Sequence, residues 1–205
     1  MTPSTITERA ALKVFGIPEL AHLICGTIGK GDNVNLLRVC RQLFHDILPF
    51  VWEDVDEANI LVSMIPGGGI ITYDSDWSPY VVMQLPDSLD LTRFKIYAPH
   101  VKRFTPSALH VDEYDGWERF LLCTQSIDLL PNLETLCLPA LDNTRYTHSH
   151  HRTIEADTIK WITAFLSTSL QTLELAPPEV RRSNGDELWL NLPLFHGLMK
   201  SVSQK

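Results

Sequence analysis

The chain has 205 residues, of which 44% are hydrophobic and 20% charged, the composition of an ordinary globular protein. Its formal net charge of −8 argues against a nucleic-acid-binding surface, because phosphate recognition requires clustered basic residues and Arg181-Arg182 is too short a cluster. No apolar run approaches the roughly 20 residues that span a bilayer, and the N-terminal MTPSTITERA lacks the basic start and apolar core of a signal peptide. We therefore expect an intracellular protein of the cytoplasm, the nucleus or both, without membrane contact.

Apolar helices form the first strong pattern along the chain. A first helix is predicted to begin at Pro18, since proline is tolerated at the first helical position, and apolar residues then recur at spacings of three and four until two glycines end the helix. Asp32 is predicted to cap a second helix, whose apolar stripe continues through Phe44. A third, short helix is expected to be interrupted at Pro49 and followed by Trp52, which we interpret as a packed hinge.

These helices carry more apolar surface than they can bury alone. Domains below about 40 residues usually need a metal, disulfides or a partner for stability. Neither a metal-binding nor a disulfide pattern is visible between residues 14 and 55. We therefore expect the helices to bind a partner protein through their apolar faces, as helix-in-groove elements do.

The same segment also carries a recognisable order of residues. They are Ile17, Pro18, Glu19, Leu20, Leu23, Ile24, Asp32, Leu36, Val39, Cys40, Arg41, Phe44 and Trp52. Their order and spacing resemble the F-box, with Asn33 where that family usually has leucine and Leu43-Phe44 where it usually has tryptophan. The resemblance implies a three-helix module that docks on the Skp-family adaptor of a cullin–RING ubiquitin ligase.

The four cysteines show no Cys-x-x-Cys spacing, and three of them lie in apolar helix or strand patterns. We predict that Cys25, Cys40, Cys123 and Cys137 are buried, reduced thiols that pack as small hydrophobic residues.

A connector with a small hairpin is predicted over residues 56–85. The apolar run at 60–65 fits either a helix end or a strand, and Pro66 with the glycines after it forces a turn. Strands are expected on both sides of the acidic stretch that begins at Asp74. Neither these glycines nor those at 26–31 have the spacing of a phosphate-binding loop.

The C-terminal half contains a weak internal repeat. Residues 133–138 and 170–175 both match L-x-T-L-x-L, 37 positions apart, and 101–104 is a degenerate copy 32 positions before the first of them. Each clear copy follows a helical pattern, so we predict helix, turn and short strand units with parallel strands, as in leucine-rich repeats. The spacing exceeds the usual 20–29 residues, so the units are enlarged and irregular.

This irregular repeat resembles that of fungal F-box proteins, and the resemblance covers residues 14–55 strongly and 86–176 more weakly. The predicted fold class is therefore α+β or α/β, a three-helix F-box followed by a short, irregular α/β leucine-rich-repeat-like solenoid with parallel strands. The expected units are a tail (1–13), the F-box (14–55), the connector (56–85) and the repeat region (86–205).

Nothing local supports an enzyme. His148, His150 and His151 lie in a polar segment without a carboxylate or thiol at a spacing that would complete a metal site. No Gly-x-Ser-x-Gly elbow is present. We expect no catalytic residue, no cofactor and no metal.

The sequence thus predicts a substrate receptor of a Skp–cullin–F-box ubiquitin ligase, which holds the adaptor and cullin scaffold on one side and a protein target on the other. The alternative is a scaffold that binds the adaptor or other proteins without delivering targets. The expected adaptor-binding residues are Pro18, Glu19, Leu20, Leu23, Ile24, Leu36, Leu37, Val39, Cys40 and Phe44. The expected target-binding residues, placed to point outward from the strands, are Glu134, Cys137, Gln171, Thr172 and Glu174.

Overall fold

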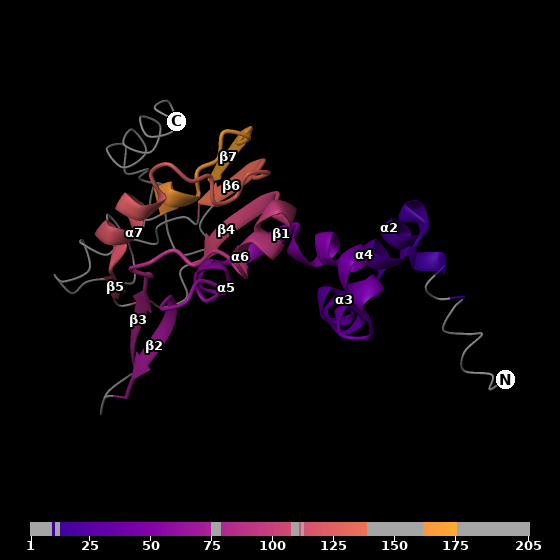
Figure 1. Cartoon of the computed structure of the whole chain (residues 1–205), viewed down its shortest axis with the longest axis horizontal. Helices are drawn as coiled ribbons and strands as arrows, with labels where there is room; N and C mark the ends of the chain where they lie inside the picture. The colour runs from indigo at the N-terminus through magenta and orange to yellow at the C-terminus, as the bar shows by residue number, and fades with distance from the viewer. Residues whose placement is uncertain are drawn as a thin grey trace, which may run out of the picture.

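The computed structural model describes residues 10, 13–74, 79–107, 111, 113–138 and 162–175. Three helices form a unit at one end of the molecule, and two sheets with short helices form a larger body at the other (Figure 1). The fold is therefore mixed α/β, as the sequence predicts at that level.

The helical unit begins with α2 (Pro18–Thr27), so the predicted start at Pro18 is confirmed. Proline occupies the first helical turn, where its missing N–H leaves no helical bond unmade. The helix ends where Ile28 turns to extended backbone, just before Gly29.

The second helix, α3 (Lys30–Leu37), starts earlier than predicted. Gly29 is its N-cap, not Asp32, which lies in the first turn of the helix. A carboxylate in this turn still stabilises the helix, because the free N–H groups carry partial positive charge.

The apolar stripe predicted to form one helix through Phe44 is divided between α3 and α4 (Arg41–Trp52). The amides of Arg38 and Val39 bond to carbonyls three residues earlier, which tightens the last turn of α3. Cys40 is then fully extended, with φ −158° and ψ 166°, and serves as the N-cap of α4. The break lets α4 fold back and pack against α3.

The predicted interruption at Pro49 is also wrong, because α4 runs through it to Trp52. A proline inside a helix removes one hydrogen bond and costs about 3 kcal/mol. The buried side chains of Ile47, Leu48 and Val51 surround this position, and their packing holds the last turn in place.

The body contains a parallel sheet of four strands in the order β1-β4-β6-β7, formed by β1 (Asp54–Glu57), β4 (Arg103–Ser107), β6 (Thr135–Leu138) and β7 (Thr172–Leu175). Arg103 pairs with Thr135, and Thr135 pairs with Thr172. These steps of 32 (135 − 103) and 37 (172 − 135) are the spacings of the predicted copies, so their parallel pairing is confirmed.

A shared backbone contact precedes three of these strands. The carbonyls of Glu53, Lys102 and Glu134 each accept hydrogen bonds from two successive amides, at 2.8 to 2.9 Å. These amides belong to the first residue of the neighbouring strand and the residue before it. The chain therefore enters each new strand in the same way, although the intervening segments differ in length.

Strand β1 was not predicted. Its sequence, Asp-Val-Asp-Glu, is acidic and has low strand propensity, and it lies across the expected boundary between residues 55 and 56. Its pairing with β4 supplies the hydrogen bonds that local propensity does not, and Val55 packs into the core.

A second sheet contains the predicted hairpin. The apolar run at 60–65 is helical where it forms α5 (Ala58–Val62), and a turn with positive φ at Gly67 and Gly69 follows. Strands β2 (Gly69–Tyr73) and β3 (Tyr80–Gln84) then pair antiparallel. Strand β5 (Glu113–Asp115) joins β3 in parallel, so the expected connector shares a sheet with the region that follows it.

One hydrophobic core fills the body, from Val55 to Leu166. Phe104 and Phe120 pack around Phe165 with ring centroids 5.4 and 6.0 Å from it. The helical segments of this region are α6 (Phe94–Tyr97), η1 (Ala98–His100), α7 (Trp117–Thr124) and η2 (Thr163–Phe165). The helix predicted before the first clear copy is α7. The segment before the second clear copy is described only from residue 162 onward.

Candidate functional site

The helical unit has a small core of its own. Cys25, Leu43, Ile47 and Val51 are its buried members, with exposures between 0% and 6%. Five large apolar side chains of this unit remain exposed: Ile17 (45%), Leu20 (39%), Leu23 (62%), Val34 (40%) and Val39 (66%). The helices therefore present apolar surface that the rest of the described chain does not cover.

Asn33 supports the arrangement from inside. It is only 3% exposed, and its side-chain amide donates a hydrogen bond of 2.9 Å to the carbonyl of Cys25, near the end of α2. Its Oδ1 is buried without a partner among the described residues. The side chain thus fixes α3 against α2, at the position where the F-box usually has leucine.

The residues predicted to bind an adaptor separate into two groups. Pro18, Glu19, Leu20, Leu23 and Val39 are exposed. The half-buried group consists of Ile24, Leu36, Leu37, Cys40 and Phe44. Leu36, Leu37 and Cys40 pack against the small helical core, so their main contacts are internal.

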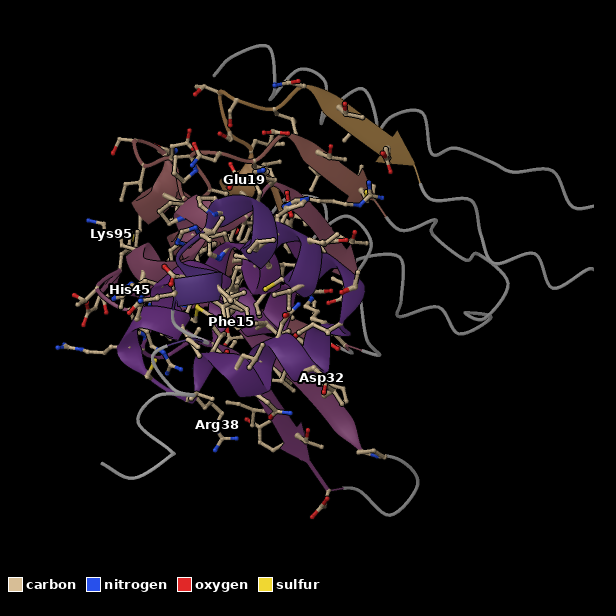
Figure 2. All side chains as sticks on the ribbon, turned by 90° about the vertical axis from the view of Figure 1, so that its right-hand side faces the viewer. Phe15, Glu19, Asp32, Arg38, His45 and Lys95 are labelled. Carbon is tan, nitrogen blue, oxygen red and sulfur yellow. The ribbon has the colours of Figure 1, made fainter. Side chains whose placement is uncertain are left out.

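Phe44 is directed toward the body. Its ring centroid lies 6.5 Å from that of Tyr97 in an edge-on arrangement. Figure 2 looks onto the helical end of the molecule and shows Phe15 near its middle, with the polar Glu19, Asp32 and Arg38 around it. The surface open to a partner therefore centres on α2 and the α3–α4 junction.

Trp52 joins the two parts of the molecule. It packs against both the helical core and the body core, and its ring centroid lies 4.7 Å from that of Tyr97. Lys30 adds a polar contact, donating to the backbone oxygen of Asp54 at 2.9 Å and lying 3.7 Å from the Asp56 carboxylate. The position of Trp52 agrees with the packed hinge that the sequence predicts.

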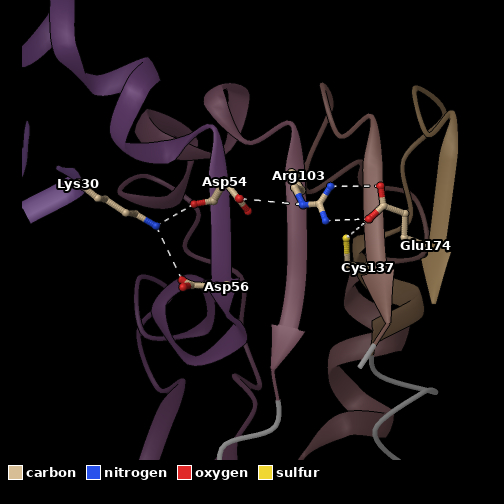
Figure 3. Close-up of polar contacts among 6 residues, drawn as sticks. All are labelled: Lys30, Asp54, Asp56, Arg103, Cys137 and Glu174. Carbon is tan, nitrogen blue, oxygen red and sulfur yellow. Dashed lines mark hydrogen bonds and ion pairs between the residues drawn. The ribbon is translucent and has the colours of Figure 1, made fainter. Parts of the chain in front are cut away.

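The outer face of the parallel sheet carries a row of charged side chains (Figure 3). Arg103 donates two hydrogen bonds to the Glu174 carboxylate, at 2.7 and 3.2 Å, and its Nε lies 4.0 Å from Asp54. The thiol of Cys137 donates to the same carboxylate at 3.2 Å. Because β6 lies between β4 and β7, the Arg103–Glu174 pair bridges over it and covers Cys137.

These contacts change the acidity of the groups involved. The hydrogen bonds from Arg103 and then Cys137 lower the pKa of Glu174 below its usual value. Burial, together with the neighbouring Glu174 carboxylate, raises the pKa of the Cys137 thiol. Glu174 is therefore held ionised and Cys137 protonated, which makes this cysteine a poor nucleophile.

Four of the five residues predicted to bind a target are at least partly exposed, with Glu134 and Gln171 just before β6 and β7 and with Thr172 and Glu174 on β7. Glu134, Gln171 and Thr172 are exposed, and Glu174 is half-buried. Cys137 is the exception, because it is only 3% exposed. A target could contact its side chain only if the Arg103–Glu174 pair above it moved away. Sequence reasoning missed Arg103, which occupies the same register position as Thr135 and Thr172 and could have been found from the repeat.

An open groove of about 430 Å³ lies at the entry to the strands. It is lined by Phe50, Glu53, Asp54, Lys102, Arg103, Glu134 and Thr135. Lys102 pairs with Glu53 at 3.0 Å, and this hydrogen bond raises the pKa of the lysine. The three acidic and two basic side chains of the groove therefore compensate one another only in part.

The prediction of buried cysteines is only partly correct. All four are free thiols; Cys25 and Cys137 are buried, whereas Cys40 is half-buried and Cys123 is exposed. The histidine cluster of residues 148–151 lies outside the described residues. Within the described ranges, no group of three or more His, Cys, Asp or Glu side chains could hold a metal ion. No described helix is long and apolar enough to cross a bilayer.

Comparison of the chain with protein-family models, with curated proteins and with solved structures finds no match. A function is therefore inferred from the geometry of the two surfaces and from the motif resemblance.

Proposed function

We propose that this chain is a substrate receptor of a Skp–cullin–F-box ubiquitin ligase. The observation that supports this most is the exposed apolar surface on α2 and the α3–α4 junction, where Leu23 and Val39 are 62% and 66% exposed. These residues belong to the motif that resembles an F-box, and the resemblance implies a Skp-family adaptor as the protein that covers them.

The exposed apolar side chains can offset much of the cost of such a contact. Fully burying a leucine or valine is worth about 1.5–3 kcal/mol, while association costs about 4–15 kcal/mol. The five exposed side chains Ile17, Leu20, Leu23, Val34 and Val39 together offer a gain of the same size as this cost. The half-buried residues beneath them keep the helices in position.

The body then supplies the second surface of a receptor. Its outer face is formed by strands that enter the sheet in the same way, and it carries ordered, bridged charges such as Arg103 and Glu174. A target held there is kept near the ligase at high effective concentration, so a receptor needs no catalytic group of its own.

The test is co-purification with a Skp-family adaptor, with Leu23→Ala and Val39→Ala combined. The two truncations delete five carbons, which at about 0.8 kcal/mol per buried CH₂ removes up to about 4 kcal/mol, roughly a thousandfold in Kd. We expect the variant to lose the adaptor while keeping the circular dichroism of the wild type.

Leu122→Ala is the matched control, because Leu122 is also 66% exposed but lies on α7 in the body. It should retain the adaptor fully. Failure of the wild-type chain to bind any Skp-family adaptor, or full binding by the double variant, would refute the proposal.

A further inference from the structure

Strand β2 lies at the outer edge of the three-stranded sheet, whose order is β2-β3-β5. The hairpin of β2 and β3 projects from the rest of the body, on a side away from the helical unit (Figure 1). Among the described strands, β2 pairs only with β3. Its other edge therefore presents alternate N–H and C=O groups that can accept a further strand.

Apolar side chains gather on one face of this hairpin. The register places Ile71 opposite Val82 and Tyr73 opposite Tyr80, so these four share a face. Of these four, Ile71, Tyr73 and Tyr80 are 38%, 54% and 43% exposed and Val82 is 8% exposed, whereas the opposite face packs on the body core through Met83. The hydroxyl of Tyr80 donates a hydrogen bond of 2.9 Å to Glu113 of β5. The exposed face continues to the edge that lacks a described neighbour.

The sequence of β2 lacks two features that commonly protect an edge strand from pairing. The five residues of β2, Gly-Ile-Ile-Thr-Tyr, include no charge and no proline, which are the features that natural edge strands use to prevent association. The acidic residues of this sheet, Glu113 and Asp115, lie on β5 at the opposite edge.

We propose that β2 is a dimerisation strand, which pairs antiparallel with β2 of a second copy of this chain. Pairing centred on Ile71 would join two three-stranded sheets into one continuous sheet and would bring the exposed apolar side chains of both copies together. The strand is complementary to itself because it carries no charge that would oppose its own copy.

The charges around the strand also fit a second copy. Asp74 lies three residues beyond Ile71, so the two Asp74 carboxylates are six residues apart, about 20 Å at about 3.4 Å per residue. The two β5 strands are separated by five strand spacings, about 24 Å. Both distances exceed the screening length of about 8 Å at physiological salt, so repulsion between these particular carboxylates is weak in the paired arrangement.

The test measures the mass of the full-length chain by sedimentation velocity over a range of concentrations, for the wild type and for Ile71→Lys. The substitution places two lysines opposite each other at the centre of the pairing, where like charges are destabilising. We expect a concentration-dependent dimer for the wild type and a monomer for the variant. Ile96→Lys is the matched control, since Ile96 is 47% exposed on α6, and it should dimerise as the wild type does.

The exposed face of α2 could also cause self-association, so the Leu23→Ala/Val39→Ala chain is measured in parallel and should still dimerise. A dimer that survives Ile71→Lys but is lost in this double variant would overturn the proposal. A monomeric wild type would also overturn the proposal. If the amides of β2 then exchange slowly in that monomer, another segment or partner covers the strand. If Ile71→Lys does not fold, Ile71→Glu, which places two carboxylates opposite each other at the same central pair, replaces it.

Discussion

At Arg103, one guanidinium connects strands that lie far apart in the sequence. It forms a two-pronged contact with Glu174 across β6 and approaches Asp54 on β1. Both members of the Arg103–Glu174 pair remain about two-fifths exposed, so solvent screens their attraction. The main consequence of the pair is geometric, because it fixes the outer face and covers Cys137.

The lowered pKa of Glu174 predicts an acid-dependent contribution to stability. A carboxyl group whose pKa is lower in the folded state stabilises the fold fully above its unfolded pKa, near 4.5, and the contribution is lost as pH falls through the folded pKa. We expect Glu174→Gln to be slightly less stable than the wild type at pH 7, with the difference decreasing as pH falls below about 4.5.

Urea unfolding at pH values between 7 and 3 measures this difference. Thr172→Ala, at an exposed position of the same strand, changes no charge and is the matched control, so its stability difference from the wild type should not follow this pH profile. A Glu174→Gln difference that stays constant in acid would contradict the assigned ion pair.

At the scale of elements, helix α7 depends on a single glycine at its start. Gly116 is the N-cap and has φ +79°, a conformation that residues with a Cβ rarely adopt. A Cβ at this position would lie 2.7 Å from the carbonyl oxygen of Leu85, which is backbone and cannot easily move. The turn between β5 and α7 therefore requires glycine for two independent reasons.

We expect Gly116→Ala to destabilise the protein by about 1–3 kcal/mol, the cost of a residue held in a sparsely populated backbone region, with further loss from the close contact. Thermal unfolding measures the effect. Gly26→Ala is the control: Gly26 lies inside α2 with nothing within 4 Å of the place where a methyl group would sit, so alanine should stabilise the helix by about 0.5–1 kcal/mol. Equal effects of the two substitutions would contradict this account.

At the scale of the whole molecule, two cores of unequal size are joined through one aromatic contact. Trp52, at the end of α4, packs against both cores and against Tyr97. Helix α4 continues into β1 after a single residue, Glu53, which still has helical backbone angles. The orientation of the helical unit is therefore set by packing at this joint and by the short connection.

We expect Trp52→Ala to uncouple the two parts. The free energy of unfolding should fall by about 3 kcal/mol, the low end for truncating a buried aromatic residue, because Trp52 is half-buried. Hydrogen exchange should become faster in α2–α4 while the body sheet keeps its protection. Lys30→Ala removes only the partly exposed polar contact and should leave the exchange pattern unchanged. Equal loss of protection in both parts would show that they unfold as one unit regardless of Trp52.

The sequence by itself determined the features that depend on neighbouring residues or on a repeat. The start of α2 at Pro18, the glycine turn at Gly67 and Gly69, the hairpin after it and the helix α7 follow from local backbone preferences and apolar spacing. The register of the parallel strands followed from the copies 32 and 37 residues apart, because equivalent positions in a repeat tend to pair. The exposed positions Leu20, Leu23 and Val39 of the candidate adaptor surface were found from motif order.

Only the tertiary structure decided the features that depend on contacts distant in sequence. The acidic segment Asp54–Glu57 is a strand because β4 lies beside it. The apolar stripe breaks at Cys40 because α4 must turn back onto α3, and Cys137 is buried because Arg103 and Glu174 meet above it. Local propensities are worth tenths of a kcal/mol per residue, up to about 1 kcal/mol, whereas burial and pairing contribute more and become defined only when distant segments meet.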